Sequence, residues 1–273
     1  MLDVLLHASA PRRNLGPARY VFHQTANVQS IFSVGANTLI VAGVIACVAG
    51  VVRGITGFGG AMVMAPPLAL LLGPQLAVPV ILVLESVAAA PMLVQTRHRV
   101  QWKVIGAIIL AACVTVPLGV LMLVAVDPTI IRRAIAITVI VFAIVLLRGW
   151  RYAGRPRLAT SVGLGAVSGA MLGATSIGGP PVILYLLSGP DPIETTRANL
   201  TLYVAVSSLI GVAMLWQQGL FDARAGWTSV LLAPAYYVGL VAGLRLFRRF
   251  SDTRFRQFTL LLLIVVSTGI LLA

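Results

Sequence analysis

Long apolar stretches dominate the chain, and few polar positions interrupt them. Charged residues are absent from Val104 to Val126, Leu158 to Pro190, Ala198 to Phe221, Ala225 to Leu244 and Gln257 to Ala273. A helix of about 20 apolar residues crosses a hydrocarbon core of roughly 30 Å. The strict alternation of apolar and polar residues that is typical of a membrane barrel does not occur in the sequence. The pattern therefore predicts an all-α polytopic membrane protein.

The apolar pattern divides into two series of five elements. The first series is 34–52, 61–72, 76–95, 104–126 and 130–147, and the second is 159–176, 180–189, 199–216, 227–246 and 257–273. Two elements, 61–72 and 180–189, would reach only about 18 Å and 15 Å as helices, which is too short to cross. We therefore expect about 8 to 10 helices that span the membrane or reach halfway through it.

The two series are related by an internal repeat. At an offset of 119 residues, 48–63 aligns with 167–182, and seven of the 16 columns are identical. The chain thus divides into a tail (1–33), a first repeat (34–147), a basic cytoplasmic linker (148–158) and a second repeat (159–273). Because five elements is an odd number, we expect the second half to be inverted relative to the first.

The charge distribution agrees with that orientation. Hydrophobic residues make up 59% of the chain and charged residues 10%, which excludes an ordinary soluble domain. The net charge of +13 comes mainly from Arg in short loops, which does not suit nucleic acid. In the predicted topology one face collects 14 of the 20 Lys and Arg residues, and basic loops mark the cytoplasmic side. This topology places both termini outside.

Two glycine turns precede the short elements and are the candidate binding site. Irregular backbone inside a membrane is tolerated where it is buried in protein or lines an aqueous cavity. A half-helix that starts there directs its positive end and free N–H groups at an anion. The candidate substrate-binding residues are Thr56, Gly57, Gly59, Gly60, Thr175, Ser176, Gly178 and Gly179. The alternative is that such glycines only permit close helix packing, and we favour packing for Gly50, Gly54, Gly165, Gly169, Gly173, Gly239 and Gly243.

Four further polar residues are candidates for gating or coupling. Glu85 is the only carboxylate deep in an apolar element, so it is either a proton-coupling site or a protonated brace of the bundle. Arg53 either attracts an anion or, as we favour, snorkels to the cytoplasmic interface. Arg197 and Asn199 start an element, where they either close the site or anchor the helix. No set of His and Cys suggests a metal or another cofactor.

These motifs resemble those of the sulfite exporter TauE/SafE family of bacterial membrane permeases. The resemblance covers about residues 35 to 273 and rests on two signatures: Gly50-x-x-x-Gly54-x-x-Gly57-x-Gly59-Gly60 with Pro66-Pro67, and Gly169-x-x-x-Gly173-x-x-x-x-Gly178-Gly179-Pro180. It implies a multi-pass carrier in the bacterial inner membrane that exports small sulfur-containing anions, such as sulfite or organosulfonates. The sequence departs from the family pattern at Arg53 and at Ser176.

Alternating access between two inverted halves is the expected mechanism. The expected partners are a small anionic substrate and the lipid bilayer, with a homo-oligomer as a further option. One alternative function is a structural or assembly subunit without transport activity of its own. The other is a membrane enzyme, which would need a group of catalytic side chains that the sequence does not supply.

Overall fold

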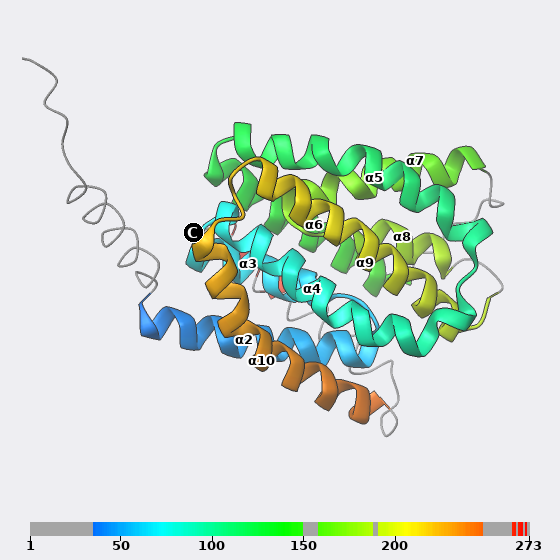
Figure 1. The fold of residues 1–273 in the computed structure, drawn as a ribbon, viewed down its shortest axis with the longest axis horizontal. Coiled ribbons are helices and arrows are strands. Elements are labelled where there is room, and N and C mark those ends of the chain that lie inside the picture. Colours follow the sequence, from blue (N-terminus) through cyan, green and yellow to red (C-terminus); the bar gives the residue numbers. More distant parts are fainter. Residues whose placement is uncertain are drawn as a thin grey trace, which may run out of the picture. The chain divides into compact units, whose positions relative to one another are not determined.

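The computed structural model describes residues 35–149, 158–187 and 191–247, together with 264–265, 267–269 and 271. These residues contain no strand, and their helices are α2 (Ala36–Thr56), α3 (Gly60–Leu72), α4 (Pro74–Thr96), η1 (Arg97–Arg99), α5 (Trp102–Ala125), α6 (Pro128–Leu147), α7 (Leu158–Thr175), α8 (Gly179–Leu186), α9 (Ile193–Gln217) and α10 (Ala223–Phe247) (Figure 1). Nine of the ten predicted elements correspond to these helices. The tail 1–33, most of the linker and most of the element 257–273 lie outside the described residues.

Seven of the described helices, α2, α4, α5, α6, α7, α9 and α10, are long and apolar enough to cross a membrane. The protein is therefore an all-α polytopic membrane protein, as predicted. The helices α3 and α8 have 13 and 8 residues, or about 20 Å and 12 Å. Both are shorter than the hydrocarbon core, so the expectation of two short elements is confirmed.

The helices α4 and α9 form the centre of the bundle. In their most apolar segments, 61% and 67% of the residues are buried, against 33–44% in the other five long helices. The outer helices expose apolar side chains at helical spacing, and on α5 these are Leu110, Val114, Leu118 and Leu121. A stripe of this kind suits contact with lipid tails.

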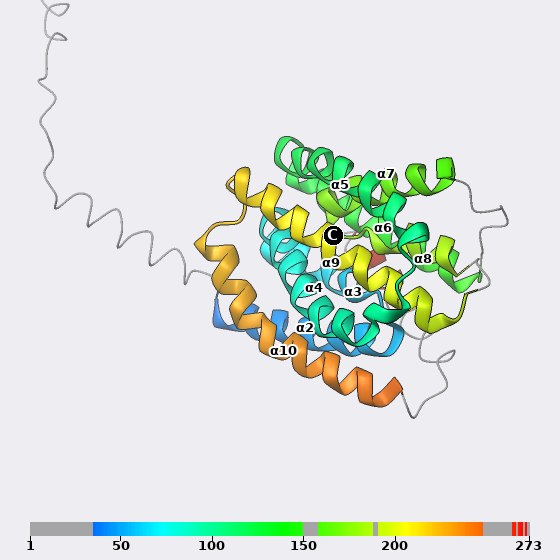
Figure 2. The ribbon, with the colours of Figure 1, turned by 45° about the vertical axis from the view of Figure 1, so that its right-hand side comes forward.

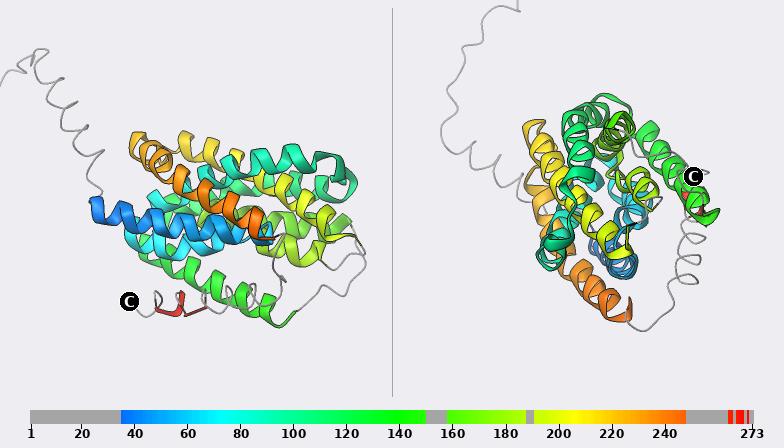
Figure 3. Two further views of the ribbon diagram at one scale, coloured as in Figure 1. Left: turned by 90° about the horizontal axis from the view of Figure 1, so that it is seen from below. Right: turned by 90° about the vertical axis from the view of Figure 1, so that its right-hand side faces the viewer.

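Two close helix pairs flank the centre: α2 lies along α10, and α5 lies along α7 (Figures 1 and 2). Figure 3 shows the same bundle from two further sides. A side-chain carbon added at Gly50 or Gly54 would lie closer than 3.0 Å to the α10 backbone. The same addition at Gly169 or Gly173, their counterparts in the repeat, would lie equally close to the α5 backbone. The packing interpretation of these glycines is confirmed.

The loop after α4 lies against the beginning of α9. The Gln101 N–H donates to Asn199 Oδ1 (2.8 Å), and the Gln101 side-chain amide donates to Asp191 Oδ1 (2.9 Å). Because α9 has 25 residues, its other end is about 37 Å away. The loop 218–222 follows that far end. The two loops, which occupy equivalent places in the two halves, therefore lie at opposite ends of α9.

Candidate functional site

The first glycine turn links α2 to α3 inside the bundle. Gly57 and Gly59 have φ angles of 80° and 87°, a left-handed conformation that glycine adopts without steric cost. The Gly57 N–H donates to Arg53 O (2.8 Å) and closes the last turn of α2. The Thr56 hydroxyl lies within hydrogen-bond reach of the carbonyls of Val52 (2.8 Å) and Phe58, and it accepts from the Phe58 N–H (3.3 Å).

The second turn, between α7 and α8, repeats this geometry 119 residues later. Ser176 takes the place of Gly57 with a φ angle of 62°, and its N–H donates to Leu172 O (2.8 Å). Thr175 donates to Met171 O (2.7 Å) and accepts from the Ile177 N–H (3.3 Å), as Thr56 does in the first turn. The repeat seen in the sequence thus extends to individual hydrogen bonds.

The hydroxyls of the two threonines form hydrogen bonds within their own turns. Each hydroxyl has a single hydrogen, and backbone carbonyls accept it at both Thr56 and Thr175. In this conformation the threonine hydroxyls brace the turns and have no hydrogen left for a substrate. Ser176 likewise donates its hydroxyl to Thr175 O (2.5 Å). Substrate binding by these three residues stays a prediction.

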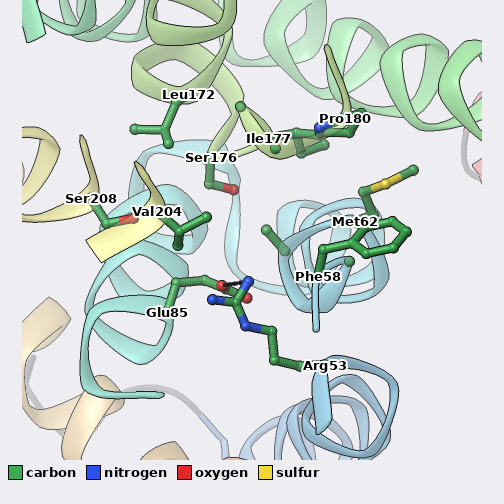
Figure 4. A pocket seen from close by; sticks show the side chains of 14 residues that line it. Arg53, Phe58, Met62, Glu85, Leu172, Ser176, Ile177, Pro180, Val204 and Ser208 are labelled. Carbon is green, nitrogen blue, oxygen red and sulfur yellow. Dashed lines mark ion pairs between the residues drawn. The ribbon is translucent and has the colours of Figure 1, made fainter. Parts of the chain in front are cut away.

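Both turns face one small cavity, with a volume of about 20 Å³ (Figure 4). Its lining consists of Arg53, Phe58, Gly59, Ala61, Met62, Glu85, Leu172, Ser176, Ile177, Gly178, Gly179, Pro180, Val204 and Ser208. Four of the eight predicted binding residues belong to this lining: Gly59, Ser176, Gly178 and Gly179. The other four, Thr56, Gly57, Gly60 and Thr175, are not part of it. The structure therefore brings the two turns together around a shared space.

Arg53 and Glu85 form a buried ion pair at the edge of this cavity. Arg53 Nη1 lies 2.7 Å from Glu85 Oε2, and the two side chains are only 2% and 3% exposed. The Tyr236 hydroxyl donates to Glu85 Oε1 (2.8 Å). The expectation that Arg53 snorkels to the interface is wrong, because its guanidinium lies inside the protein beside a carboxylate. In Figure 4 it rises from α2 toward Glu85 on α4.

Part of the Arg53 guanidinium has no partner. Among the described residues, nothing accepts a hydrogen bond from Arg53 Nε or Nη2, although both atoms are buried. The Ser208 hydroxyl on the cavity wall is also buried without a partner. A buried donor that lacks an acceptor is destabilising, by about 1–3 kcal/mol for a neutral group and more for a charged one. Unused donors at a cavity wall indicate a place where a ligand with acceptor oxygens would be stabilised.

Arg197 holds the structure around the first turn, Asn199 holds the loop after α4, and both lie outside the cavity lining. Arg197 Nη2 donates to Gly54 O (3.1 Å) near the end of α2. A side-chain carbon at Gly57 would come within 2.5 Å of Arg197 Nε, so the arginine covers that turn. Asn199 accepts from the Gln101 backbone. These contacts favour the anchoring interpretation, and gating by either residue stays a prediction.

Tyr236 and the Ser168–Tyr203 pair were not predicted as parts of the site. Ser168 donates to Gly178 O, and its hydroxyl lies 2.5 Å from the Tyr203 hydroxyl, so the pair fixes the second turn. Tyr236 fixes Glu85 from α10. The available signal was the presence of hydroxyl-bearing side chains in apolar helices, where each needs a hydrogen-bond partner. The partners themselves could not be read from the sequence.

The chain matches the model of the sulfite exporter TauE/SafE family over residues 42–270. The chain belongs to this family. The match includes both glycine turns, both short helices and the Arg53–Glu85 pair. No curated protein and no solved structure matches the chain. As a TauE/SafE protein with seven described helices long enough to span, it is a multi-pass membrane transporter.

Proposed function

We propose that this TauE/SafE protein exports small sulfur-containing anions, such as sulfite or organosulfonates, across the bacterial inner membrane. The observation that carries the proposal is the cavity that both glycine turns line, beside the buried guanidinium of Arg53. Each half of the chain supplies one turn and one short helix to that cavity. The cavity of about 20 Å³ has room for about one water molecule, so the two halves would have to move apart to admit the anion, which would then contact both of them.

The beginnings of both short helices favour an anion in the cavity. Gly59, Ala61 and Met62 line it from the first turn of α3, and Gly178, Gly179 and Pro180 from the first turn of α8. Each helix start carries about half a positive charge. Pro180 and Pro181 have no N–H, so α8 contributes backbone donors only from Gly178 and Gly179. These two glycines are therefore the α8 backbone positions that we expect to contact the substrate.

Alternating access between inverted halves is the mechanism that we propose. It is supported by the equivalent turns and by the equivalent helix pairs α2–α10 and α7–α5. It is also supported by the equivalent loops 97–101 and 218–222, which lie at opposite ends of α9. Rocking of one half against the other would open the cavity first to the cytoplasm and then to the outside.

Export of an anion fits the energetics of the inner membrane. A potential that is negative inside favours the exit of each negative charge by about 2.3 kcal/mol per 100 mV. Efflux therefore needs no coupling ion, whereas uptake would have to be driven by another gradient.

A flux measurement with purified protein in proteoliposomes tests the proposal. Labelled sulfite and a small labelled sulfonate are measured separately under an imposed potential, with Gly179→Leu and Gly163→Leu as matched variants. No atom lies within 4 Å of a side-chain carbon at either glycine, but Gly179 lines the cavity and Gly163 is exposed on α7. We expect potential-dependent flux in the wild type and in Gly163→Leu, and at least a tenfold loss in Gly179→Leu.

Two results would contradict the proposal. Undiminished flux in Gly179→Leu would remove the cavity from the transport path. Absence of sulfite and sulfonate flux in folded wild-type protein, together with a partner that co-purifies in constant ratio, would favour the alternative of an assembly subunit.

A further inference from the structure

Arg53 stands out because its partners occupy only one side of the guanidinium. Nη1 is paired with Glu85, while Nε and Nη2 are buried and have no partner among the residues that the structure describes. Glu85 is itself fixed by the Tyr236 hydroxyl, so helices α4 and α10 together hold the arginine of α2 in place. The orientation of the unused side is thus set by neighbouring residues, and Arg53 is one of the residues that line the cavity.

The two unused atoms have a specific geometry. In a guanidinium, the Nε hydrogen and one Nη2 hydrogen point in parallel and form a fork that matches two oxygens bound to one atom. Carboxylates, sulfonates and sulfite present such oxygen pairs, and a monatomic anion does not. A lysine ammonium carries the same charge without the fork.

The rest of the cavity lining attracts an anion without supplying a second cationic side chain. Among the residues that line the cavity, the charged ones are Arg53 and Glu85, which neutralise one another. The positive ends of α3 and α8 also face the space. Ser208 on α9 adds a buried hydroxyl that has no hydrogen-bond partner in the described part of the chain and could donate to a third oxygen.

We propose that Arg53 binds the transported anion through the Nε–Nη2 fork, with Glu85 as the positioning residue that keeps the fork directed into the cavity. This inference rests on the proposed function and narrows it: the substrate must carry at least two oxygens on one atom. It also assigns anion binding to Arg53, a position at which this sequence departs from the family signature.

Anion binding to the purified full-length protein in detergent provides the test. Affinities for sulfite, methanesulfonate and chloride are measured by isothermal titration for the wild type, Arg53→Lys and Arg133→Lys. Arg133 is exposed on α6 and undergoes the same chemical change outside the cavity. We expect the wild type and Arg133→Lys to bind both oxyanions, and Arg53→Lys to bind them at least about tenfold more weakly, since charged hydrogen bonds are lost.

A double variant separates the loss of anion binding from a failure to fold. Replacing Arg53 alone with a neutral residue would leave Glu85 as an unpaired buried charge, whereas Arg53→Gln combined with Glu85→Gln removes both charges together. We expect the double variant to fold and to lose oxyanion binding. The wild-type preference for the two oxyanions over chloride is a further test that needs no variant.

The outcomes separate this inference from the proposed function. If the wild type transports sulfite while Arg53→Lys or the double variant binds it with wild-type affinity, the fork is refuted and the proposed function stands. Chloride binding as tight as oxyanion binding would likewise refute the fork. If the wild type neither binds nor transports sulfite or the sulfonate, both proposals are refuted.

Discussion

Gly60 and Gly179 occupy equivalent positions in the two repeats but have different surroundings. A side-chain carbon at Gly60 would lie closer than 3.0 Å to Glu85 Oε1, whereas no atom lies within 4 Å of one at Gly179. We therefore expect Gly60→Ala to lower the free energy of unfolding by about 1–3 kcal/mol through overpacking. Gly179→Ala should cost less, because its methyl group would meet no distant atom and only the following Pro180 disfavours a helical alanine there.

Thermal unfolding of the purified protein in one detergent measures this difference. Each glycine is the first residue of its short helix. Gly179 is followed by Pro180, which disfavours the helical conformation in a preceding residue that carries a Cβ atom, so the difference between the two variants is a lower bound on the cost of the contacts with Glu85 and Tyr236 at Gly60. Equal stability of the two variants would show that the Arg53–Glu85–Tyr236 cluster yields easily to an added methyl group.

The sequence predicted the backbone conformation of the site better than the contacts between its charged side chains. The 119-residue offset placed both turns correctly, because glycine and proline determine backbone conformation locally. The Arg53–Glu85 pair was missed because each residue was interpreted separately. Tyr236 lies 151 residues from Glu85 along the chain. Contacts between distant helices depend on how the helices pack, which the pattern of a single chain does not specify.

At the scale of helices, the sequence correctly predicted which helices are short, which are long enough to span a membrane, and which faces pack closely. The two short elements, the long spans and the packing glycines follow from apolar run length and from the spacing of small residues. The sequence did not reveal which helices pair. It gave no means to place α2 against α10 and α7 against α5, because small residues mark a helix face suited to close packing without specifying the partner helix.

The close pairing of α2 and α10 gives a prediction about packing. Gly50→Ala would bring a methyl group closer than 3.0 Å to the backbone of Tyr236 and Leu240, whereas Gly43, two turns earlier on α2, has no atom within 4 Å. We expect Gly50→Ala to destabilise the protein by about 1–3 kcal/mol. Gly43→Ala should be neutral or stabilising by up to about 1 kcal/mol, because alanine favours a helix over glycine.

Thermal unfolding in detergent, with both variants measured side by side, tests this packing. An equal effect of the two substitutions would indicate that α2 and α10 separate readily. That result would also weaken the idea that α10 holds Glu85 through Tyr236.

At the scale of the whole molecule, inversion of the halves is the expectation that most affects mechanism. The loops 97–101 and 218–222 occupy equivalent places in the two repeats, and His98 and Gln218 are exposed in them. If the halves are inverted and the basic loop 97–103 is cytoplasmic, His98 faces the cytoplasm and Gln218 the outside. A single cysteine is introduced at each position after Cys47 and Cys113 are replaced by alanine.

Labelling of intact cells with a maleimide that does not cross membranes distinguishes the two arrangements. We expect the cysteine at 218 to react in intact cells and the cysteine at 98 to react only after permeabilisation. Reaction of both cysteines in intact cells, or of neither, would place equivalent loops on the same side. The two glycine turns would then approach the cavity from one side, and rocking of two inverted halves could not carry the anion across.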